Sequence, residues 1–304
     1  MKTLRTHLAE YLEMRHALGF KTKRDQWLLS SFVAFLETNH RCVITTDLAL
    51  RWAKQPVEAH PGWWARKLST VRVFARHMHL ADRRHAIPPR HLLPESTPRS
   101  TPALYSSQDV LKILGAAAEL ESPFRGLTHE TLIGLLAATG MRVGEAIRLD
   151  RDDVDWKHEL IAIRHAKFRK SREVVLHTSV MRALKGYASK REQFHDKARS
   201  PAFFVSLTGT RLIYNNVHRT FAALVRRTGI GRERARLHDL RHTFAVQTLL
   251  RWHREGLDVN AWLPRLSTYL GHANPSSTYW YLTASPELMA LVGRKLERVL
   301  GVLP

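Results

Sequence analysis

Two arginines stand at spacings that would let them act on a phosphate group. Arg142 lies at a predicted helix start, and Glu145 follows three residues later, within reach on the same helical turn. Arg241 follows His238 by three residues, so their side chains share one helical face. Guanidinium groups match two phosphate oxygens and stay charged, so both arginines could stabilise a phosphate under attack. Alone, an arginine paired with a glutamate is usually structural.

A third segment offers a nucleophile. His272 follows a glycine, and Tyr281 comes nine residues later. A phenol with a pKa of about 10 is ionised in roughly one molecule per thousand at neutral pH, so it needs a proton acceptor. His238 is the candidate acceptor. Tyr279 remains an alternative nucleophile, although packing or a phosphate contact is its simpler role.

The histidines do not predict a metal site. His242 follows His238 by four residues and could be half of a zinc pair, but the glutamate of an HExxH motif is missing. Cys42 is the only cysteine, which excludes an internal disulfide and a thiolate cluster. We expect no metal and no other cofactor.

The charge balance predicts a polyanionic partner. Lysine and arginine total 48 against 27 acidic residues, a formal net charge of +21. Nucleic acid is the first candidate and an anionic membrane surface the second. No apolar run approaches the ~20 residues of a spanning helix, and the N-terminus lacks the apolar core of a secretory signal. We expect a cytoplasmic protein that binds nucleic acid and no membrane.

Residues 1–88 predict a small helical domain. Apolar side chains recur at helical spacing, most clearly between Trp63 and Leu80. Basic side chains lie off the apolar stripe of that helix: Arg66, Lys67, Arg72 and Arg76. A solvated face is the simple interpretation for a single helix, but the basic bias persists to Arg99. We therefore predict that these side chains follow DNA phosphates.

A proline-rich stretch separates this domain from a second one. Residues 86–102 hold five prolines, which predicts a linker over 89–104. The domain at 105–304 is predicted to be rich in helices, one of which ends at Gly140. Period-two runs at 160–165 and 173–176 predict a β-hairpin. Helices follow, the last over 286–301. The expected fold class is mainly α with a small hairpin or sheet.

Together these motifs resemble the tyrosine recombinases, the phage integrase family. An arginine after Thr-Gly, a His-x-x-Arg, a Leu-Gly-His and a tyrosine nine residues later occur in the family's order. The run KFRKSREVVL is similar to the family's hairpin Gly-Lys-Gly-x-Lys-x-Arg-x-Val-Pro-Leu. It places the family's catalytic lysine on Lys167, with Lys170 as a rival. The chain has His165-Ala166 where a threonine-glycine commonly precedes that lysine, and it has no proline before Leu176. Neither difference removes a functional group. The likeness is strong over 105–285 and looser before it.

The resemblance implies a fold and a reaction. The N-terminal helices would form a SAM-like, core-binding domain that clamps DNA, and the second domain would be catalytic. Tyr281 would attack the phosphate with His238 as proton acceptor, Lys167 would protonate the departing 5′ oxygen, and Glu145 would orient Arg142. The implied catalytic set is Arg142, Lys167, His238, Arg241, His272 and Tyr281.

The resemblance also implies double-stranded DNA as partner, and with it association with the nucleoid. A 3′-phosphotyrosyl link would conserve the phosphodiester's energy, so that a 5′ hydroxyl could reverse the step without metal or ATP. The hairpin would contact DNA through Lys170 and Arg172. Four protomers would meet on two DNA sites, alone or with sister recombinases. The helix at 286–301 would pack on its own domain or on the neighbouring protomer.

Three other functions remain open on the sequence. A type IB topoisomerase uses nearly the same residues to relax supercoils, although the small N-terminal domain favours a recombinase. An accessory DNA-binding homologue would need a partner to cut, although every catalytic position is filled. A metal-dependent nuclease ranks last and would be inhibited by EDTA. The motifs do not separate integration from excision, resolution or transposition.

Overall fold

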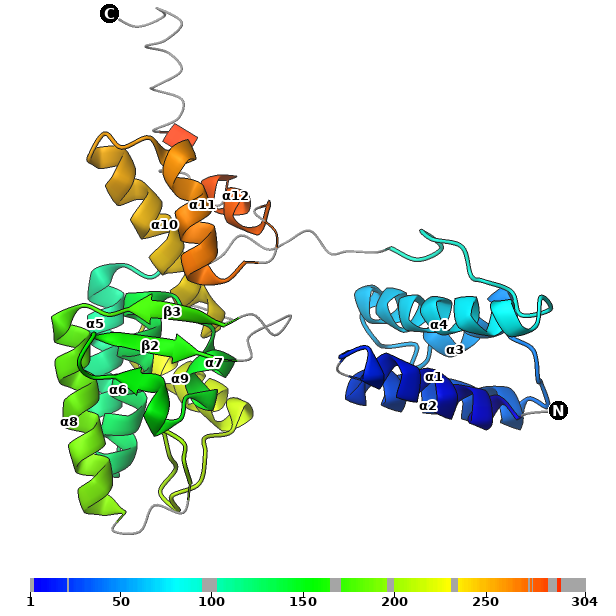
Figure 1. The fold of residues 1–304 in the computed structure, drawn as a ribbon, viewed down its shortest axis with the longest axis horizontal. Coiled ribbons are helices and arrows are strands. Elements are labelled where there is room, and N and C mark those ends of the chain that lie inside the picture. Colours follow the sequence, from blue (N-terminus) through cyan, green and yellow to red (C-terminus); the bar gives the residue numbers. More distant parts are fainter. Residues whose placement is uncertain are drawn as a thin grey trace, which may run out of the picture. The chain divides into compact units, whose positions relative to one another are not determined.

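The computed structural model divides the chain into two compact units, residues 1–100 and 101–304 (Figure 1). The residues that it describes are 3–20, 22–94, 103–164, 171–195, 200–230, 235–272, 274, 276–283 and 289–290. The expected helix at 286–301 therefore lies almost wholly outside the described residues. No helix in the described ranges has both the length and the apolar character needed to cross a membrane.

The described part of the first unit is built from helices whose apolar faces meet in one core. The helices are α1 (Leu4–Ala17), α2 (Lys23–Thr38), α3 (Thr46–Ala53) and α4 (Pro61–Ala81). Leu29, Phe32 and Leu36 of α2 and Val71 and Phe74 of α4 are fully buried. Burial of each such side chain stabilises the fold by about 1.5–3 kcal/mol. The helical spacing of apolar residues thus predicted this core.

The basic face expected on α4 is only half present. Arg66 and Arg76 are exposed, but Lys67 and Arg72 are buried, so the prediction of a shared exposed face is wrong for these two. Lys67 Nζ donates to the carbonyl oxygens of Trp52 at 2.8 Å and Gln55 at 2.6 Å. Its long aliphatic stem covers apolar surface while the ammonium group reaches backbone acceptors.

Arg72 ties the start of the proline-rich segment to α4. Its Nε donates to the carbonyl of Pro88 at 2.8 Å, and a terminal nitrogen donates to that of Pro89 at 2.9 Å. Leu93 is buried in the core of the first unit. The segment expected to be a linker from residue 89 therefore packs on the first unit as far as Leu93, because its first carbonyl groups accept from a buried guanidinium and Leu93 enters the core.

The second unit is built around a central helix, α6 (Pro123–Thr139). Helix α5 (Ser107–Ala118), α8 (Thr178–Phe194) and α10 (His238–Arg254) pack against it. Its Leu132, Ile133, Leu135 and Leu136 are buried, which makes it the centre of the larger apolar core. The remaining helices are α7 (Val143–Arg148), α9 (Tyr214–Arg227), α11 (Val259–Leu270) and α12 (Ser276–Thr283), with a 3-10 turn at Arg151–Asp153.

A small antiparallel sheet lies in the second unit (Figure 1). Its strands are β1 (Val154–Asp155), β2 (Leu160–Ile163) and β3 (Arg172–Val175), in the order β1-β2-β3. The register pairs Ile163 with Arg172 and Leu160 with Val175. The predicted hairpin strands are thus confirmed, whereas the two-residue β1 is too short to leave a period-two pattern.

Two glycines in the left-handed region end α6 and α11. Gly140 has φ +60° and Gly271 has φ +68°. A Cβ atom at Gly140 would lie 2.5 Å from Phe244, and one at Gly271 would lie 2.6 Å from Arg172. Both positions therefore require glycine for backbone conformation and for space.

Replacing Gly140 should destabilise the second unit. We expect Gly140→Ala to lower the free energy of unfolding by about 2 kcal/mol or more, because the left-handed conformation alone costs an alanine roughly 1–2 kcal/mol. Urea unfolding followed by circular dichroism measures the change. Gly186→Ala is the control: it lies inside α8 with open space around an added Cβ, and should stabilise by about 0.5–1 kcal/mol. Equal urea midpoints for Gly140→Ala and wild type would contradict the requirement for glycine at this position.

Candidate active site

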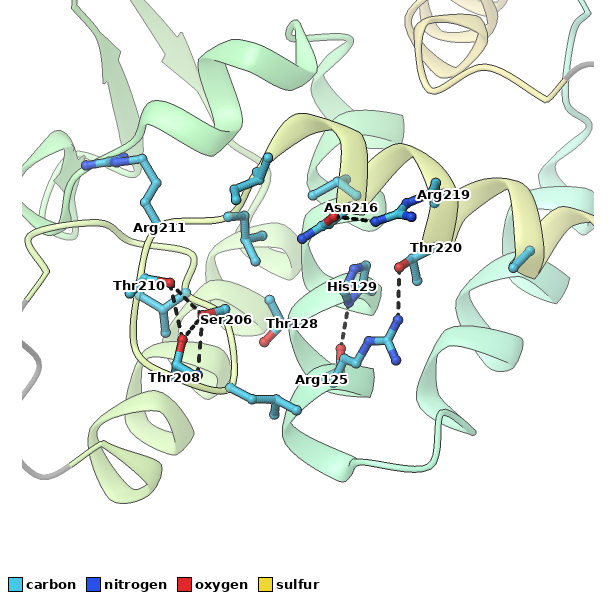
Figure 2. A pocket seen from close by; sticks show the side chains of 16 residues that line it. Arg125, Thr128, His129, Ser206, Thr208, Thr210, Arg211, Asn216, Arg219 and Thr220 are labelled. Carbon is cyan, nitrogen blue, oxygen red and sulfur yellow. Dashed lines mark hydrogen bonds between the residues drawn. The ribbon is translucent and has the colours of Figure 1, made fainter.

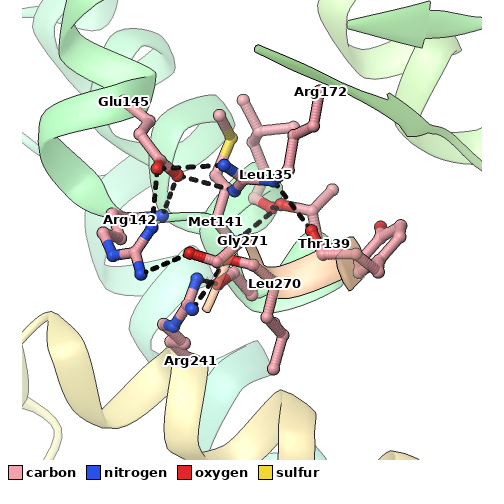
Figure 3. Close-up of polar contacts among 11 residues, drawn as sticks. Leu135, Thr139, Met141, Arg142, Glu145, Arg172, Arg241, Leu270 and Gly271 are labelled. Carbon is pink, nitrogen blue, oxygen red and sulfur yellow. Dashed lines mark hydrogen bonds and ion pairs between the residues drawn. The ribbon is translucent and has the colours of Figure 1, made fainter. Parts of the chain in front are cut away.

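Two of the candidate catalytic residues, Arg142 and Arg241, lie near the ends of helices that meet in the second unit (Figure 3). Arg142 is the N-cap residue of α7, directly after the end of α6. His238 and Arg241 lie in the first turn of α10, and His272 follows the end of α11. Tyr281 lies on α12, which packs against α10 and α11.

Arg241 is held by the carboxyl ends of two helices. One terminal nitrogen donates to the carbonyl of Gly140 at 2.9 Å and the other to that of Leu270 at 2.8 Å. Helix carboxyl ends carry partial negative charge, so they stabilise a cation there. Burial, followed by the charge of Arg142, lowers the pKa of Arg241 to about 10, opposed by Tyr281. Arg241 therefore remains charged at neutral pH although only 2% of it is exposed.

Arg142 is held by a helix end and a carboxylate. A terminal nitrogen donates to the carbonyl of Gly271 at 2.9 Å, and the other donates to Glu145 Oε1 at 2.9 Å. Glu145 Oε2 also accepts from the backbone N–H of Arg142. The Arg142 side chain is 30% exposed, so it can still reach a ligand.

The preceding Thr-Gly pair is also explained by hydrogen bonds. The hydroxyl of Thr139 donates to the carbonyl of Leu135 at 2.6 Å and accepts from the backbone N–H of Met141 at 3.3 Å. These bonds fix the turn between α6 and α7, the turn that delivers Arg142 to the site (Figure 3).

Glu145 binds a second arginine that was predicted to contact DNA. Arg172 donates to both carboxylate oxygens, at 3.1 and 2.8 Å, and through Nε to the carbonyl of Tyr269 at 2.8 Å. Its side chain is only 11% exposed. The predicted DNA contact of Arg172 is therefore not supported by its position: the side chain is committed to a buried bidentate ion pair. The residues around Arg172 in the sequence did not indicate that Glu145 would be its partner.

The site histidines are held neutral. Burial, followed by the positive charges of Arg241 and Arg142, lowers the pKa of His238 to about 4 and that of His272 to about 3. His272 Nδ1 lies 2.6 Å from the hydroxyl of Thr278, a partner that motif spacing did not reveal. A neutral imidazole at either position can accept a proton.

Tyr281 is buried among these groups, whereas Tyr279 is not. Tyr281 is 2% exposed, its ring stacks on that of His272 with centroids 5.9 Å apart, and it interacts electrostatically with Arg241. Tyr279 is 49% exposed. The structure thus buries Tyr281, and not Tyr279, near Arg241. Lys167 and Lys170 lie outside the described residues.

A hollow in the second unit lies apart from the candidate residues. Its volume is about 760 Å³, and it is lined by α6, α9 and the loop between Val205 and Ile213 (Figure 2). It shares no residue with the candidate set. Within the described ranges, no three His, Cys, Asp or Glu side chains gather as a metal site would require.

The ion pairs of Glu145 should make stability depend on pH. Burial alone would raise its pKa, but hydrogen bonds and charge from Arg172, then hydrogen bonds from Arg142, hold the pKa at about 2. A lowered pKa contributes stability that is present above the unfolded value of about 4.3 and is lost as pH falls toward 2. The shift corresponds to roughly 3 kcal/mol.

Glu145→Gln tests this contribution. We expect the variant to unfold at lower urea than wild type at pH 7, with the difference shrinking as the pH is lowered from 5 toward 2. Glu173→Gln on β3, where the carboxylate is exposed, is the control and should leave stability within about 0.5 kcal/mol. If the difference in stability between Glu145→Gln and wild type did not change with pH, the charge of the Glu145 carboxylate would not be what stabilises the fold.

Comparisons with known proteins agree with this arrangement. The sequence matches the family described as "Phage integrase family" over residues 105–287. The relative y4rB of Sinorhizobium fredii (strain NBRC 101917 / NGR234), which carries the name of an integrase/recombinase, is 45% identical over 308 residues and each chain is 98% covered.

Solved structures share the fold. The Tn1549 transposon integrase in complex with transposon right-end DNA has a TM-score of 0.70 at 16% identity, covering 98% of this chain and 100% of that one. A lambda integrase tetramer bound to a Holliday junction has a TM-score of 0.60 at 17% identity, covering 92% and 77%. On the match over more than half of its length, the chain belongs to the phage integrase family, the tyrosine recombinases.

Proposed function

We propose that this protein is a site-specific recombinase that cleaves and rejoins double-stranded DNA through a covalent link to Tyr281. The observation that carries the proposal is the meeting of a buried tyrosine, two arginines and two neutral histidines at the ends of α6, α10 and α11. Two fixed positive charges beside a nucleophile suit attack on a phosphodiester.

The first chemical step joins the Tyr281 oxygen to phosphorus while the bond from phosphorus to the 5′ oxygen breaks. The phenol proton passes to His238, and the departing oxygen takes a proton from Lys167, which we propose as the acid although it lies outside the described residues. Burial, followed by the positive charge of the arginines, lowers the pKa of His238; a phosphate bound between the arginines would offset the second of these effects and so make His238 a better base.

Arg142, Arg241 and His272 would hold the phosphate during this step. Two guanidinium forks can bind its non-bridging oxygens, supplying the positive charge that other phosphoryl-transfer enzymes obtain from a metal. Tyr281 interacts electrostatically with Arg241 and raises its pKa, so a phosphate held by Arg241 would lie close to the nucleophile.

Rejoining uses the same residues in reverse. The 3′-phosphotyrosyl link conserves the energy of the broken bond, so a 5′ hydroxyl from another strand can attack it without ATP. Exchange of strands between two DNA sites would require four protomers. The lambda integrase that shares this fold is described as a tetramer on a Holliday junction, which supports the same assembly here.

Covalent trapping tests the reaction. Wild-type protein mixed with nicked duplex DNA in EDTA should leave a protein–DNA band after denaturation in SDS. Tyr281→Phe should abolish that band, because the attacking oxygen is removed, whereas the exposed Tyr279→Phe should retain it. DNA binding in a shift assay without any covalent band from wild type would contradict the proposal and favour an accessory DNA-binding protein. Relaxation of plasmids without site preference would favour a topoisomerase.

The first unit offers a basic surface for DNA. Arg66 and Arg76 are exposed on α4, and Arg76 borders a hollow of about 270 Å³ that Arg72, Arg90 and His91 also line. Arginine side chains grouped on one surface suit the regularly spaced phosphates of a duplex. We propose that this surface contacts the DNA backbone.

Removing these charges should weaken DNA binding in a salt-dependent way. We expect Arg66→Gln with Arg76→Gln to reduce affinity for every duplex, and to reduce the slope of log K against log salt by roughly 1 per lost phosphate contact. Fluorescence anisotropy at several salt concentrations measures both. Arg5→Gln is the control, since Arg5 is an exposed arginine already paired with Glu37. Unchanged slopes in the double variant would show that this face does not contact phosphates.

A further inference from the structure

His242 contacts both the proposed proton acceptor and the proposed nucleophile. Its ring packs edge-on to that of His238, with centroids 4.6 Å apart, and to that of Tyr281 at 5.4 Å. It also packs edge-on to Trp280 at 5.2 Å. His242 follows Arg241 directly on α10, whereas Trp280 and Tyr281 belong to α12. One ring therefore joins the helix that carries the base to the helix that carries the nucleophile.

Contacts with neighbouring rings hold this ring in place. His242 Nδ1 is buried, and it has no hydrogen-bond partner among the described residues. An unpaired buried polar atom is unfavourable, so the contacts with the three rings must outweigh that penalty. Edge-on aromatic pairs attract beyond the effect of area burial and prefer specific angles. The ring of His242 thereby restricts the angles at which its neighbours can lie.

The ring is also uncharged. Burial, followed by electrostatic interactions with the neighbouring basic groups His238, Arg236, Arg241 and His272, lowers the pKa of His242 to about 3. A neutral ring adds no further repulsion beside Arg241 and behaves as an aromatic surface. A phenylalanine ring could therefore make the same contacts.

We propose that His242 is a positioning residue whose ring fixes the orientation of Tyr281 and His238 relative to one another. The proposal rests on the proposed function, in which Tyr281 is the nucleophile. Displacement of a reacting group by about 1 Å can slow a reaction by roughly 100-fold, so the loss of a ring between base and nucleophile should be visible in the rate of cleavage.

Two substitutions of His242 distinguish the packing of its ring from any chemical role of its ring nitrogens. At saturating nicked DNA, we expect His242→Ala to form the covalent complex about 10- to 100-fold more slowly than wild type, with DNA affinity unchanged. His242→Phe should stay within about threefold of wild type, because the ring is restored. His253→Ala, in the last turn of the same helix, is the matched control and should cleave at the wild-type rate. Cleavage by His242→Ala at the wild-type rate would overturn the proposal, as would His242→Phe being as slow as His242→Ala.

A measurement without DNA tests the orientation directly. The ring-proton NMR signals of Tyr281, identified by their absence in Tyr281→Phe, should move in His242→Ala and move much less in His242→Phe, because neighbouring aromatic rings shift them. Unmoved Tyr281 signals in His242→Ala would overturn the proposal. If wild type formed no covalent complex, the proposed function would fail, and this spectrum would still decide whether His242 orients Tyr281.

Discussion

Two positive charges held close together in a partly buried site are the constraint on which the second unit depends. Burial and then the charge of Arg142 lower the pKa of Arg241, which shows that the guanidinium groups repel each other. The carbonyl oxygens of Gly140, Leu270 and Gly271 offset that repulsion. Helices α6 and α11 must therefore both end beside Arg142 and Arg241. The large core around α6 helps to hold the end of that helix in position.

One carboxylate extends this constraint to the sheet. Glu145 binds Arg142 beside the site and Arg172 at the start of β3, so the sheet, α7 and the end of α11 share one ion-pair cluster. Because Lys167 precedes Arg172 by five residues, the cluster also fixes where the strand after that lysine begins. Loss of Glu145 would thus affect two elements at once, which a contact with Arg142 alone would not do.

Local patterns in the sequence predicted most helices and the end of α6, since periodicity and glycine preference act over a few residues. Motif spacing also named the site residues that the structure brings together. The burial of Lys67, Arg72 and Arg172 could not be predicted, because it depends on carbonyl and carboxylate groups that only tertiary structure places nearby. The packing of His242 was missed for the same reason: its partner rings on α12 lie almost forty residues further along the chain.

Reliance on backbone acceptors gives the site an unusual tolerance. Substitution of a side chain cannot remove a carbonyl oxygen, so many exposed positions of α6 and α11 are free to vary without loss of the contacts to the arginines. The lengths of α6 and α11, in contrast, are tightly constrained. One inserted or deleted residue rotates the last carbonyl by about 100° and shifts it by about 1.5 Å, which would turn it away from the guanidinium group. Descendants of this chain can therefore change the composition of these two helices far more readily than the number of residues in them.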